Sequence, residues 1–301
     1  MLRQLLTLYS HVSLRTAQKI GSLLGLSAWY LQTDERRIAQ INLTHCFPEM
    51  DPAERTRLAK RSLQESGKLL AEVPLVWLQP ASRLSDRVYA EEGMEEIRRI
   101  KQSGKGLVLI VPHMGNWEIA LSQATKVINM TVLYRPPRQR WLEEVMTLGR
   151  QATGAKTAPT NASGIKQLLA ALKNGEGVAI LPDQAPKKIG GSAAVFAPFF
   201  GQPAYTMTLA ARLAAKTGAE VRAVHVERLP AGKGFQISLY PVDDAIYGKS
   251  TEKSVQAINA AVELCVRKCP EQYQWSYKRF QVQPDGKRSI YSRNKKPKPA
   301  N

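Results

Sequence analysis

Residues 107–121 read Leu-Val-Leu-Ile-Val-Pro-His-Met-Gly-Asn-Trp-Glu-Ile-Ala-Leu. The unbroken apolar run 107–111 is typical of a buried strand, and apolar residues resume directly after Glu118 as they would in a helix. A histidine, His113, and a glutamate, Glu118, stand at the junction of the two elements. These residues therefore predict a strand, a turn and a helix, with two ionisable side chains where the strand ends.

The spacing of His113 and Glu118 restricts how they can meet. Residues three or four apart are neighbours on a helix, so these two side chains can meet only if His113 lies in the loop and Glu118 in the first helical turn. Glu118 would then hold one imidazole nitrogen, and the other nitrogen would take a proton. The pattern indicates a general-base dyad beside a helix N-terminus, which favours negative charge. The alternative is an ordinary loop histidine followed by a favourable first-turn glutamate.

Helical and extended segments alternate along the rest of the chain. We expect strands at 107–111, 130–134, 178–181, 220–229 and 235–242, and helices at 34–78 (broken near Pro48 and Pro52), 91–101, 117–127, 140–153, 162–173, 205–217 and 251–269. This alternation predicts an α/β fold with a central, largely buried mixed sheet flanked by helices. Ligand sites in such sheets gather where strands end. His113 and Asp183 each follow a buried strand, so we expect them to share a site.

The composition indicates a basic globular protein with acidic partners. The chain has 301 residues, is 44% hydrophobic and has a net charge of +18. It is long enough for one sizeable core. The basic excess favours binding to nucleic acid, anionic lipid or an acidic carrier protein. Aromatic residues, 7% of the chain, do not alternate with basic ones, which gives no support to an RNA-reading module.

Cysteine and histidine usage gives no sign of a disulfide framework or a metal site. Cys46, Cys265 and Cys269 are odd in number and lack C-x-x-C spacing. We expect reduced thiols that serve in packing. The four histidines show no ligand spacing, so no metal is expected.

We divide the chain into residues 1–33, 34–285 and 286–301. The uncharged run 20–33 is too short to span a hydrocarbon core of ~30 Å, and no signal-peptide cleavage site follows it. An amphipathic helix lying in the membrane interface is one interpretation, with Trp29 and Tyr30 at headgroup depth. An ordinary core-facing helix is the other. The last segment is basic and contains proline, as disordered tails do.

Several short motifs together resemble a known family. His113 and Glu118 match the H-x4-E form of the H-x4-D/E motif of glycerolipid-type acyltransferases. The chain is similar, over most of its length, to the bacterial late acyltransferases of lipid A biosynthesis. The matching motifs are Arg37-Ile38-Ala39, Asn42-Leu43, Cys46-Phe47-Pro48-Glu49, Tyr134-Arg135-Pro136-Pro137, Gly149-Arg150, Leu181-Pro182-Asp183-Gln184, Pro270-Glu271-Gln272-Tyr273-Gln274-Trp275 and Lys278-Arg279-Phe280.

The resemblance implies an α/β acyltransferase at the cytoplasmic face of the bacterial inner membrane. Such an enzyme moves a fatty acyl chain from acyl carrier protein to a hydroxyl of an acyl chain on an anionic lipid A precursor. The carrier thioester is then the co-substrate, and no other cofactor and no nucleic acid are expected. Val178 and Ala179 stand where the E-G-T-R block of glycerophosphate acyltransferases would have Thr and Arg. This departure disfavours a glycerol-phosphate acceptor.

The resemblance also implies roles for individual residues. His113 is expected to be the general base and Glu118 its orienting partner, with backbone amides near Gly115, or Arg150, stabilising the oxyanion. Five positions are expected to bind substrate or shape the site: Asn116, Arg135, Arg150, Asp183 and Gln184. From the residues alone, an exposed ion pair is the favoured interpretation for Arg150, and a turn or cap carboxylate is the favoured one for Asp183. For Arg135, a solvated basic loop residue and a substrate contact are equally favoured.

Three other functions fit some of these observations. The same dyad would suit an acyltransferase for another membrane lipid, or a hydrolase in which water attacks a thioester or lipid ester. A basic protein that only binds nucleic acid or membranes would account for the net charge. It would not explain why His113, Glu118 and Asp183 stand near strand ends.

Overall fold

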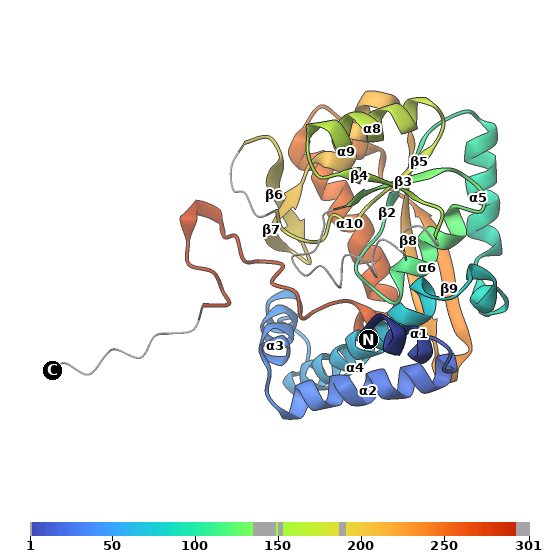
Figure 1. Ribbon diagram of the computed structural model, residues 1–301. Coiled ribbons are helices and arrows are strands. Elements are labelled where there is room, and N and C mark those ends of the chain that lie inside the picture. Colours follow the sequence, from blue (N-terminus) through green and yellow to red (C-terminus); the bar gives the residue numbers. More distant parts are fainter. Residues whose placement is uncertain (1, 135–148, 150–152, 187–190, 293–301) are drawn as a thin grey trace.

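The computed structural model describes residues 2–134, 149, 153–186 and 191–292 (Figure 1). Its central sheet has seven strands in the order β1-β9-β8-β2-β5-β3-β4. β8 and β9 are antiparallel and the other neighbouring pairs are parallel. The predicted mixed sheet is therefore confirmed. Its strands are β1 Val88–Tyr89, β2 Leu107–Ile110, β3 Met130–Tyr134, β4 Lys156–Pro159, β5 Gly177–Ile180, β8 Glu220–Leu229 and β9 Gly234–Pro241.

Helices cover both faces of this sheet (Figure 1). On one side lie α5 (Glu91–Gln102) and α6 (Trp117–Ala124), and on the other α8 (Ala162–Lys173), α9 (Leu209–Thr217) and α10 (Thr251–Lys268). Successive side chains of a strand point to opposite faces. In β2, Leu107 and Leu109 therefore enter the core beside α5 and α6, while Val108 and Ile110 enter the other core. A strand buried on both faces must be apolar throughout, as 107–111 is.

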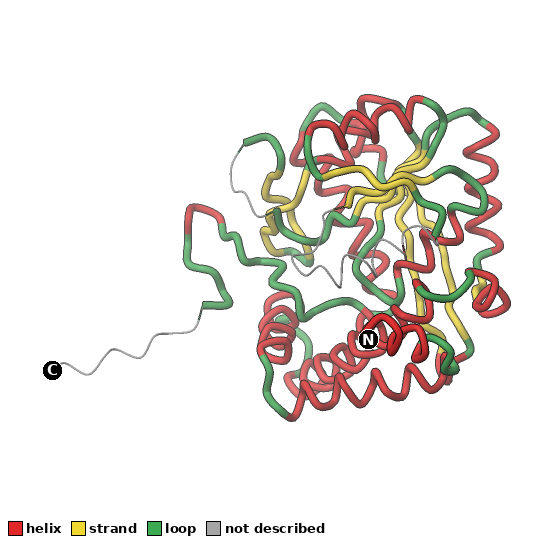
Figure 2. The backbone as a smooth tube through the Cα atoms, in the orientation of Figure 1, coloured by secondary structure: helices red, strands yellow, loops and turns green. Residues whose placement is uncertain are grey.

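The N-terminal helices form a layer of their own beside the sheet, as Figure 2 shows. They are α1 (Leu2–Tyr9), α2 (Leu14–Tyr30), α3 (Asp34–Cys46) and α4 (Pro52–Trp77). The predicted break is confirmed, since Asp51 caps α4 by accepting the amides of Ala53 and Glu54. α2 and α4 touch through glycines: a Cβ on Gly67 would lie 2.1 Å from the Gly21 carbonyl oxygen. Only residues without a side chain allow so close a contact.

One predicted helix begins too early. We expected a helix over 205–217, but residues 202–207 form strand β7 (Gln202–Met207), paired antiparallel with β6 (Ala194–Phe199). Phe200 and Gly201 both have positive φ, which suits a two-residue hairpin turn. The helix α9 starts only at Leu209. Most of the predicted helix 140–153 lies outside the described residues.

The chain ends differ in part from expectation. Trp29 is 7% exposed, with the Arg36 guanidinium 4.2 Å from its ring centroid, so its predicted place at headgroup depth is wrong. Tyr30 is 68% exposed. In the part of the chain that the structure describes, no helix has the length and apolar character needed to cross a membrane. Within the expected basic tail, Tyr291 is buried, and its hydroxyl accepts the Phe280 amide at 3.0 Å.

The three cysteines are buried and unbridged. Burial raises the pKa of Cys265 to about 12 and that of Cys269 to about 12, and it raises the pKa of Cys46 still further. Since the thiolate is the reactive form, a thiol reagent at pH 8 should label the folded protein very slowly. All three thiols should react at once in guanidinium chloride. Rapid labelling of native protein would contradict this packing.

Candidate active site

His113 and Asp183 form a polar pair at the end of the sheet. The His113 Nδ1 atom lies 2.7 Å from Asp183 Oδ1, and the His113 amide donates to Asp183 Oδ2 at 2.8 Å. Strands β2 and β5 explain the pairing, because Ile110 stands beside Ile180 in parallel register. His113 and Asp183 each follow three residues later, so they leave the sheet at the same level. The expectation that they share a site is confirmed as a matter of geometry.

The surroundings keep Asp183 ionised. Burial opposes its charge, but the His113 ring, two hydrogen bonds from His113 and the Arg279 guanidinium outweigh burial and hold the pKa of the carboxyl below its usual range. Burial and the Asp183 charge raise the pKa of the Tyr273 hydroxyl well above its usual value, so it remains a donor toward Asp183. An ionised Asp183 fixes the proton on Nδ1 and leaves Nε2 to accept one.

Glu118 lies elsewhere than expected. It is in the first turn of α6 and 4% exposed, and it accepts a hydrogen bond from Trp77 Nε1 at 3.3 Å. We expected Glu118 to hold one imidazole nitrogen of His113. In the described structure the carboxylate that pairs with the ring is Asp183, at Nδ1, so the expected His113–Glu118 pairing is wrong. The cause is the direction of the Glu118 side chain, which extends from the first turn of α6 toward Trp77 on α4. The end of β5 instead places Asp183 beside the His113 ring. Glu118 nevertheless lines the same cavity as His113.

The turn after His113 packs against Val226 and is hydrogen-bonded to the backbone of residues 272–274. Gly115 has φ +55°, and a Cβ there would lie 2.0 Å from the Val226 carbonyl oxygen, so only glycine fits. The Gly115 amide donates to the Gln272 carbonyl oxygen at 3.0 Å. This amide is therefore already engaged, which argues against its expected role in an oxyanion hole. The Gln274 amide donates to the His113 carbonyl oxygen at 3.0 Å.

An apolar cavity of about 800 Å³ opens beside His113. The wall combines aliphatic side chains from the sheet, α4 and α6 with a few polar groups, which is the usual make-up of a ligand site. Its described lining is Leu69, Leu70, Val73, Trp77, Leu109, Val111, His113, Trp117, Glu118, Ala120, Leu121, Val132, Leu133, Thr160, Ala179, Ile180, Leu181, Gln184, Ala185, Pro186, Met207, Gln274 and Tyr277.

The other expected site residues fall into three groups. Gln184 lines the cavity. Asn116 is fully buried, does not line the described cavity wall, and donates to Glu72 on α4 at 3.1 Å, so its contact is with the protein interior. Arg135 and Arg150 lie outside the described residues. Among the described residues, no three His, Cys, Asp or Glu side chains gather as metal ligands would. The absence of a metal requirement stays a prediction.

Two polar residues of the cavity were missed as site residues by the sequence reasoning. Gln274 and Tyr277 line the wall beside His113, and Gln274 Oε1 is buried with no hydrogen-bond partner among the described residues. Gln274 lies within the motif at 270–275, to which no role was given, and Tyr277 follows it. Only the family resemblance of residues 270–275 could have marked this segment as part of the site, because no local sequence pattern links it to His113.

Comparison with known proteins agrees with the motifs. Residues 4–282 match the family described as bacterial lipid A biosynthesis acyltransferase. The lipid A biosynthesis lauroyltransferase of Escherichia coli K12 is 30% identical over 274 residues, covering 91% of this chain and 88% of the relative. The palmitoleoyltransferase of the same strain is 26% identical over 273 residues (90% and 87%), and the myristoyltransferase 25% over 276 residues (90% and 82%). The chain therefore belongs to the bacterial lipid A biosynthesis acyltransferase family.

Proposed function

We propose that the protein transfers a fatty acyl chain from an acyl-carrier-protein thioester to a hydroxyl of an acyl chain on a lipid A precursor. The observation that supports this most directly is the His113–Asp183 pair at an apolar cavity of about 800 Å³. Such a site provides a base for an alcohol and room for a hydrocarbon chain. The family supports acyl transfer, and its named relatives act in lipid A biosynthesis.

His113 would act as the general base in a direct transfer. Its Nε2 takes the proton of the acceptor hydroxyl as that oxygen attacks the thioester carbonyl carbon. The imidazolium that forms is stabilised by the ionised Asp183, which is 2.7 Å from Nδ1. The tetrahedral intermediate then collapses, the carbon–sulfur bond breaks, and the carrier thiolate leaves with the proton from Nε2. An ester and a free carrier thiol result, so atoms and charge balance.

The cavity wall suggests where the substrates bind. Leu109, Leu121 and Val132 line a surface suited to a hydrocarbon chain. The Gln274 Oε1 atom is buried and has no donor within the described part of the chain. It is suited to accept a hydrogen bond from a substrate hydroxyl or amide, because a buried acceptor without a donor is costly. Glu118 and Gln184 add polar atoms to the same wall. We assign them to substrate contact or orientation.

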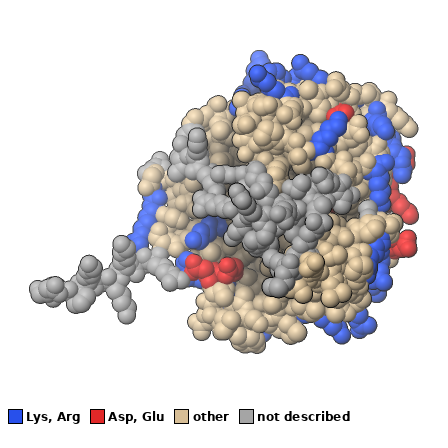
Figure 3. Space-filling view, in the orientation of Figure 1, with Lys and Arg blue, Asp and Glu red and all other residues tan. Residues whose placement is uncertain are grey.

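The exposed leucines of the N-terminal helices support a place at the cytoplasmic face of the inner membrane. Leu23, Leu24 and Leu31 of the α2 region are 64%, 54% and 77% exposed. Large aliphatic side chains so exposed, on a chain of net charge +18, suit an interface with anionic lipid. Around the rim of the face in Figure 3, basic atoms form several patches and acidic atoms fewer. The same charge suits acidic acyl carrier protein.

Charged substitution on α2 should weaken binding to lipid. The double variant Leu23→Asp and Leu24→Asp removes two side chains that would each contribute roughly 1.5–3 kcal/mol on burial, so affinity for phosphatidylglycerol vesicles should fall at least tenfold. Vesicle flotation measures this. Leu264→Asp on α10 is the control, since Leu264 is also exposed, at 42%. Equal flotation of the double variant and wild type would refute binding through α2.

Acyl transfer is tested with purified protein and dodecanoyl or tetradecanoyl acyl carrier protein, with and without a purified lipid A precursor. We expect a product heavier by one acyl group by mass spectrometry, formed only with the lipid present. Free fatty acid as the dominant product in both reactions would instead establish a hydrolase. Acylation of glycerophospholipid in place of the lipid A precursor would establish another membrane lipid as acceptor.

A further inference from the structure

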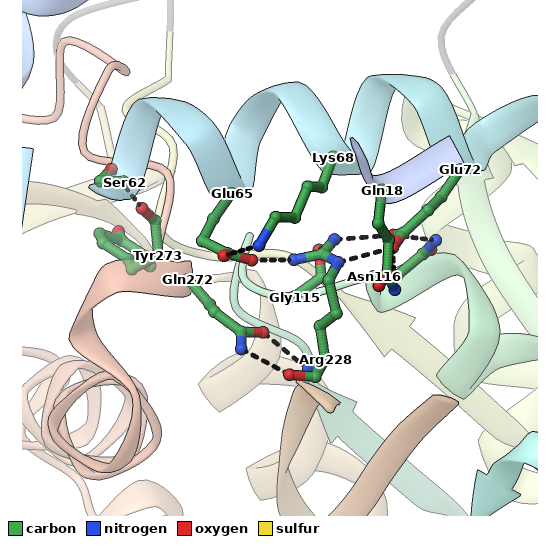
Figure 4. Close-up of polar contacts among 10 residues, drawn as sticks. All are labelled: Gln18, Ser62, Glu65, Lys68, Glu72, Gly115, Asn116, Arg228, Gln272 and Tyr273. Carbon is green, nitrogen blue, oxygen red and sulfur yellow. Dashed lines mark hydrogen bonds and ion pairs between the residues drawn. The ribbon is translucent and has the colours of Figure 1, made fainter. Parts of the chain in front are cut away.

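The ion pair between Glu72 of α4 and Arg228 of β8 lies beside Gly115 and Asn116, in the turn that follows His113 (Figure 4). We infer that this pair is a positioning device, which fixes the turn so that His113 meets the acceptor hydroxyl in a reactive geometry. The inference rests on the proposed role of His113 as general base. Neither residue lines the described cavity wall, so both act through the turn and not by touching substrate.

The pair is buried, and all three guanidinium nitrogens of Arg228 donate to carboxylates. Arg228 is 4% exposed and Glu72 is 0% exposed. Arg228 Nε donates to Glu72 Oε1 at 2.6 Å and Nη2 donates to Glu72 Oε2 at 2.7 Å. This bidentate pairing fixes the orientation of the guanidinium relative to the carboxylate. The remaining nitrogen, Nη1, donates to Glu65 Oε2 at 2.7 Å.

Two contacts join this pair to the turn itself. Asn116 Nδ2 donates to Glu72 Oε2 at 3.1 Å, and Arg228 Nη2 donates to the Gly115 carbonyl oxygen at 3.3 Å. Consecutive residues of the turn are thus fixed, one by each member of the pair. In Figure 4 the Arg228 guanidinium lies between Glu65, Glu72 and Gly115, with Asn116 beside Glu72.

Gln272 connects the same arginine to the turn by a second route. Its side chain accepts the Arg228 amide at 2.7 Å and donates to the Arg228 carbonyl oxygen at 2.9 Å. Its own carbonyl oxygen accepts the Gly115 amide at 3.0 Å. The Gly115 carbonyl oxygen is therefore bonded to Arg228 itself, and the Gly115 amide is bonded to Gln272, whose side chain is hydrogen-bonded to the Arg228 backbone. The motif at 270–275 thereby acquires a structural role.

Burial of these charges is not explained by stability alone. Apolar side chains of similar size in place of a buried ion pair are often neutral or stabilising, whereas loss of one partner is strongly destabilising. What apolar side chains could not supply is a set of directed bonds to Gly115 and Asn116. A misplacement of about 1 Å at a reacting group can lower a rate by about 10²-fold, so such bonds matter for catalysis.

The test compares single and paired replacements. Glu72→Gln and Arg228→Met break the pair, while the double variant Glu72→Leu and Arg228→Met removes both charges together. Arg222→Met is the matched control, because Arg222 lies on the same strand and is paired with Glu96 at 2.6 Å, roughly 20 Å along the strand from Arg228. For each variant, kcat and KM of acyl transfer are measured together with the melting temperature.

We expect the variants at Glu72 and Arg228 to lose about 10–100-fold in kcat with KM changed less than about threefold. The double variant should regain melting temperature without regaining kcat, and Arg222→Met should keep kcat within about twofold of wild type whatever its melting temperature. Recovery of kcat along with melting temperature would overturn the inference. So would a loss of kcat in Arg222→Met that matches its loss of stability.

A milder variant covers the case in which Arg228→Met does not fold. Asn116→Ala cuts only the link from Glu72 to the turn, and it should lower kcat with little effect on KM; wild-type kcat in Asn116→Ala would overturn the inference. His113→Ala is measured in parallel. Full activity in His113→Ala would refute the proposed function, whereas an inactive His113→Ala beside a fully active Glu72→Gln would refute the positioning role alone.

Discussion

Replacement of His113 with alanine is expected to lower kcat of acyl transfer by roughly 10²–10⁴-fold, the usual contribution of a positioned general base. The variant should still bind both substrates, because the rest of the cavity wall is unchanged. His113 is partly buried and its ring packs edge-on against Trp117, with centroids 4.9 Å apart. The melting temperature should also fall, because the buried Asp183 carboxylate loses its ring partner. Steady-state kinetics with the carrier thioester and lipid acceptor, together with circular dichroism, make the measurement.

His45→Ala is the matched control for this change. His45 lies on α3 and packs edge-on against Phe280, with ring centroids 4.8 Å apart, so its loss removes a comparable ring contact. It is not part of the described cavity wall. We expect its kcat to stay close to wild type. Equal activities of the His113 and His45 variants would show that His113 is not the base.

Asp183→Asn is expected to lower kcat by a similar amount, roughly 10²–10⁴-fold, because an amide neither fixes the productive tautomer nor stabilises the imidazolium. Glu118→Gln should have a smaller effect, since Glu118 bonds to Trp77 and not to Nδ1. Full activity of Asp183→Asn, with loss in Glu118→Gln, would reverse the two assignments.

The stability of the fold gives an independent measure of Asp183. Because the pKa of its carboxyl is lower in the folded protein, the carboxylate stabilises the fold at pH values above its unfolded pKa of about 3.9. That contribution is lost as pH falls through the folded pKa. Asp183→Asn should therefore show a shallower loss of melting temperature than wild type as pH is lowered below about 5. Parallel curves for the two proteins would contradict the ion pair.

Much of the sheet could be predicted because β2 and β5 are apolar on both faces and the β8–β9 pair alternates. The runs 107–111 and 178–181 became β2 and β5, and the alternating segments after 220 became the β8–β9 hairpin. The β6–β7 hairpin was missed, since its turn at Phe200 and Gly201 follows no strong alternation of apolar and polar residues. A strand and the following helix were read as one element there.

The site could be predicted only in part. Two residues that follow neighbouring strands were expected to meet, and His113 and Asp183 do. The carboxylate partner was misassigned because the spacing of His113 and Glu118 is a local pattern, whereas the pairing of β2 with β5 joins positions 70 residues apart. Glu72, Arg228 and Gln272 come from three distant elements, and no local spacing marks them as neighbours.

The glycine contact between α2 and α4 has a practical consequence for anyone who shortens this chain. If residues 1–33 were only an anchor, trimming them would yield an easily handled enzyme. Yet Gly21 lies against Gly67 of α4, and Gln18 Nε2 donates to Glu72 Oε1 at 3.0 Å. Without residues 1–33, the face of α4 that packs against α2 would be exposed to water, and Glu72 would lose the hydrogen bond from Gln18. Truncation would therefore cost turnover as well as affinity for lipid.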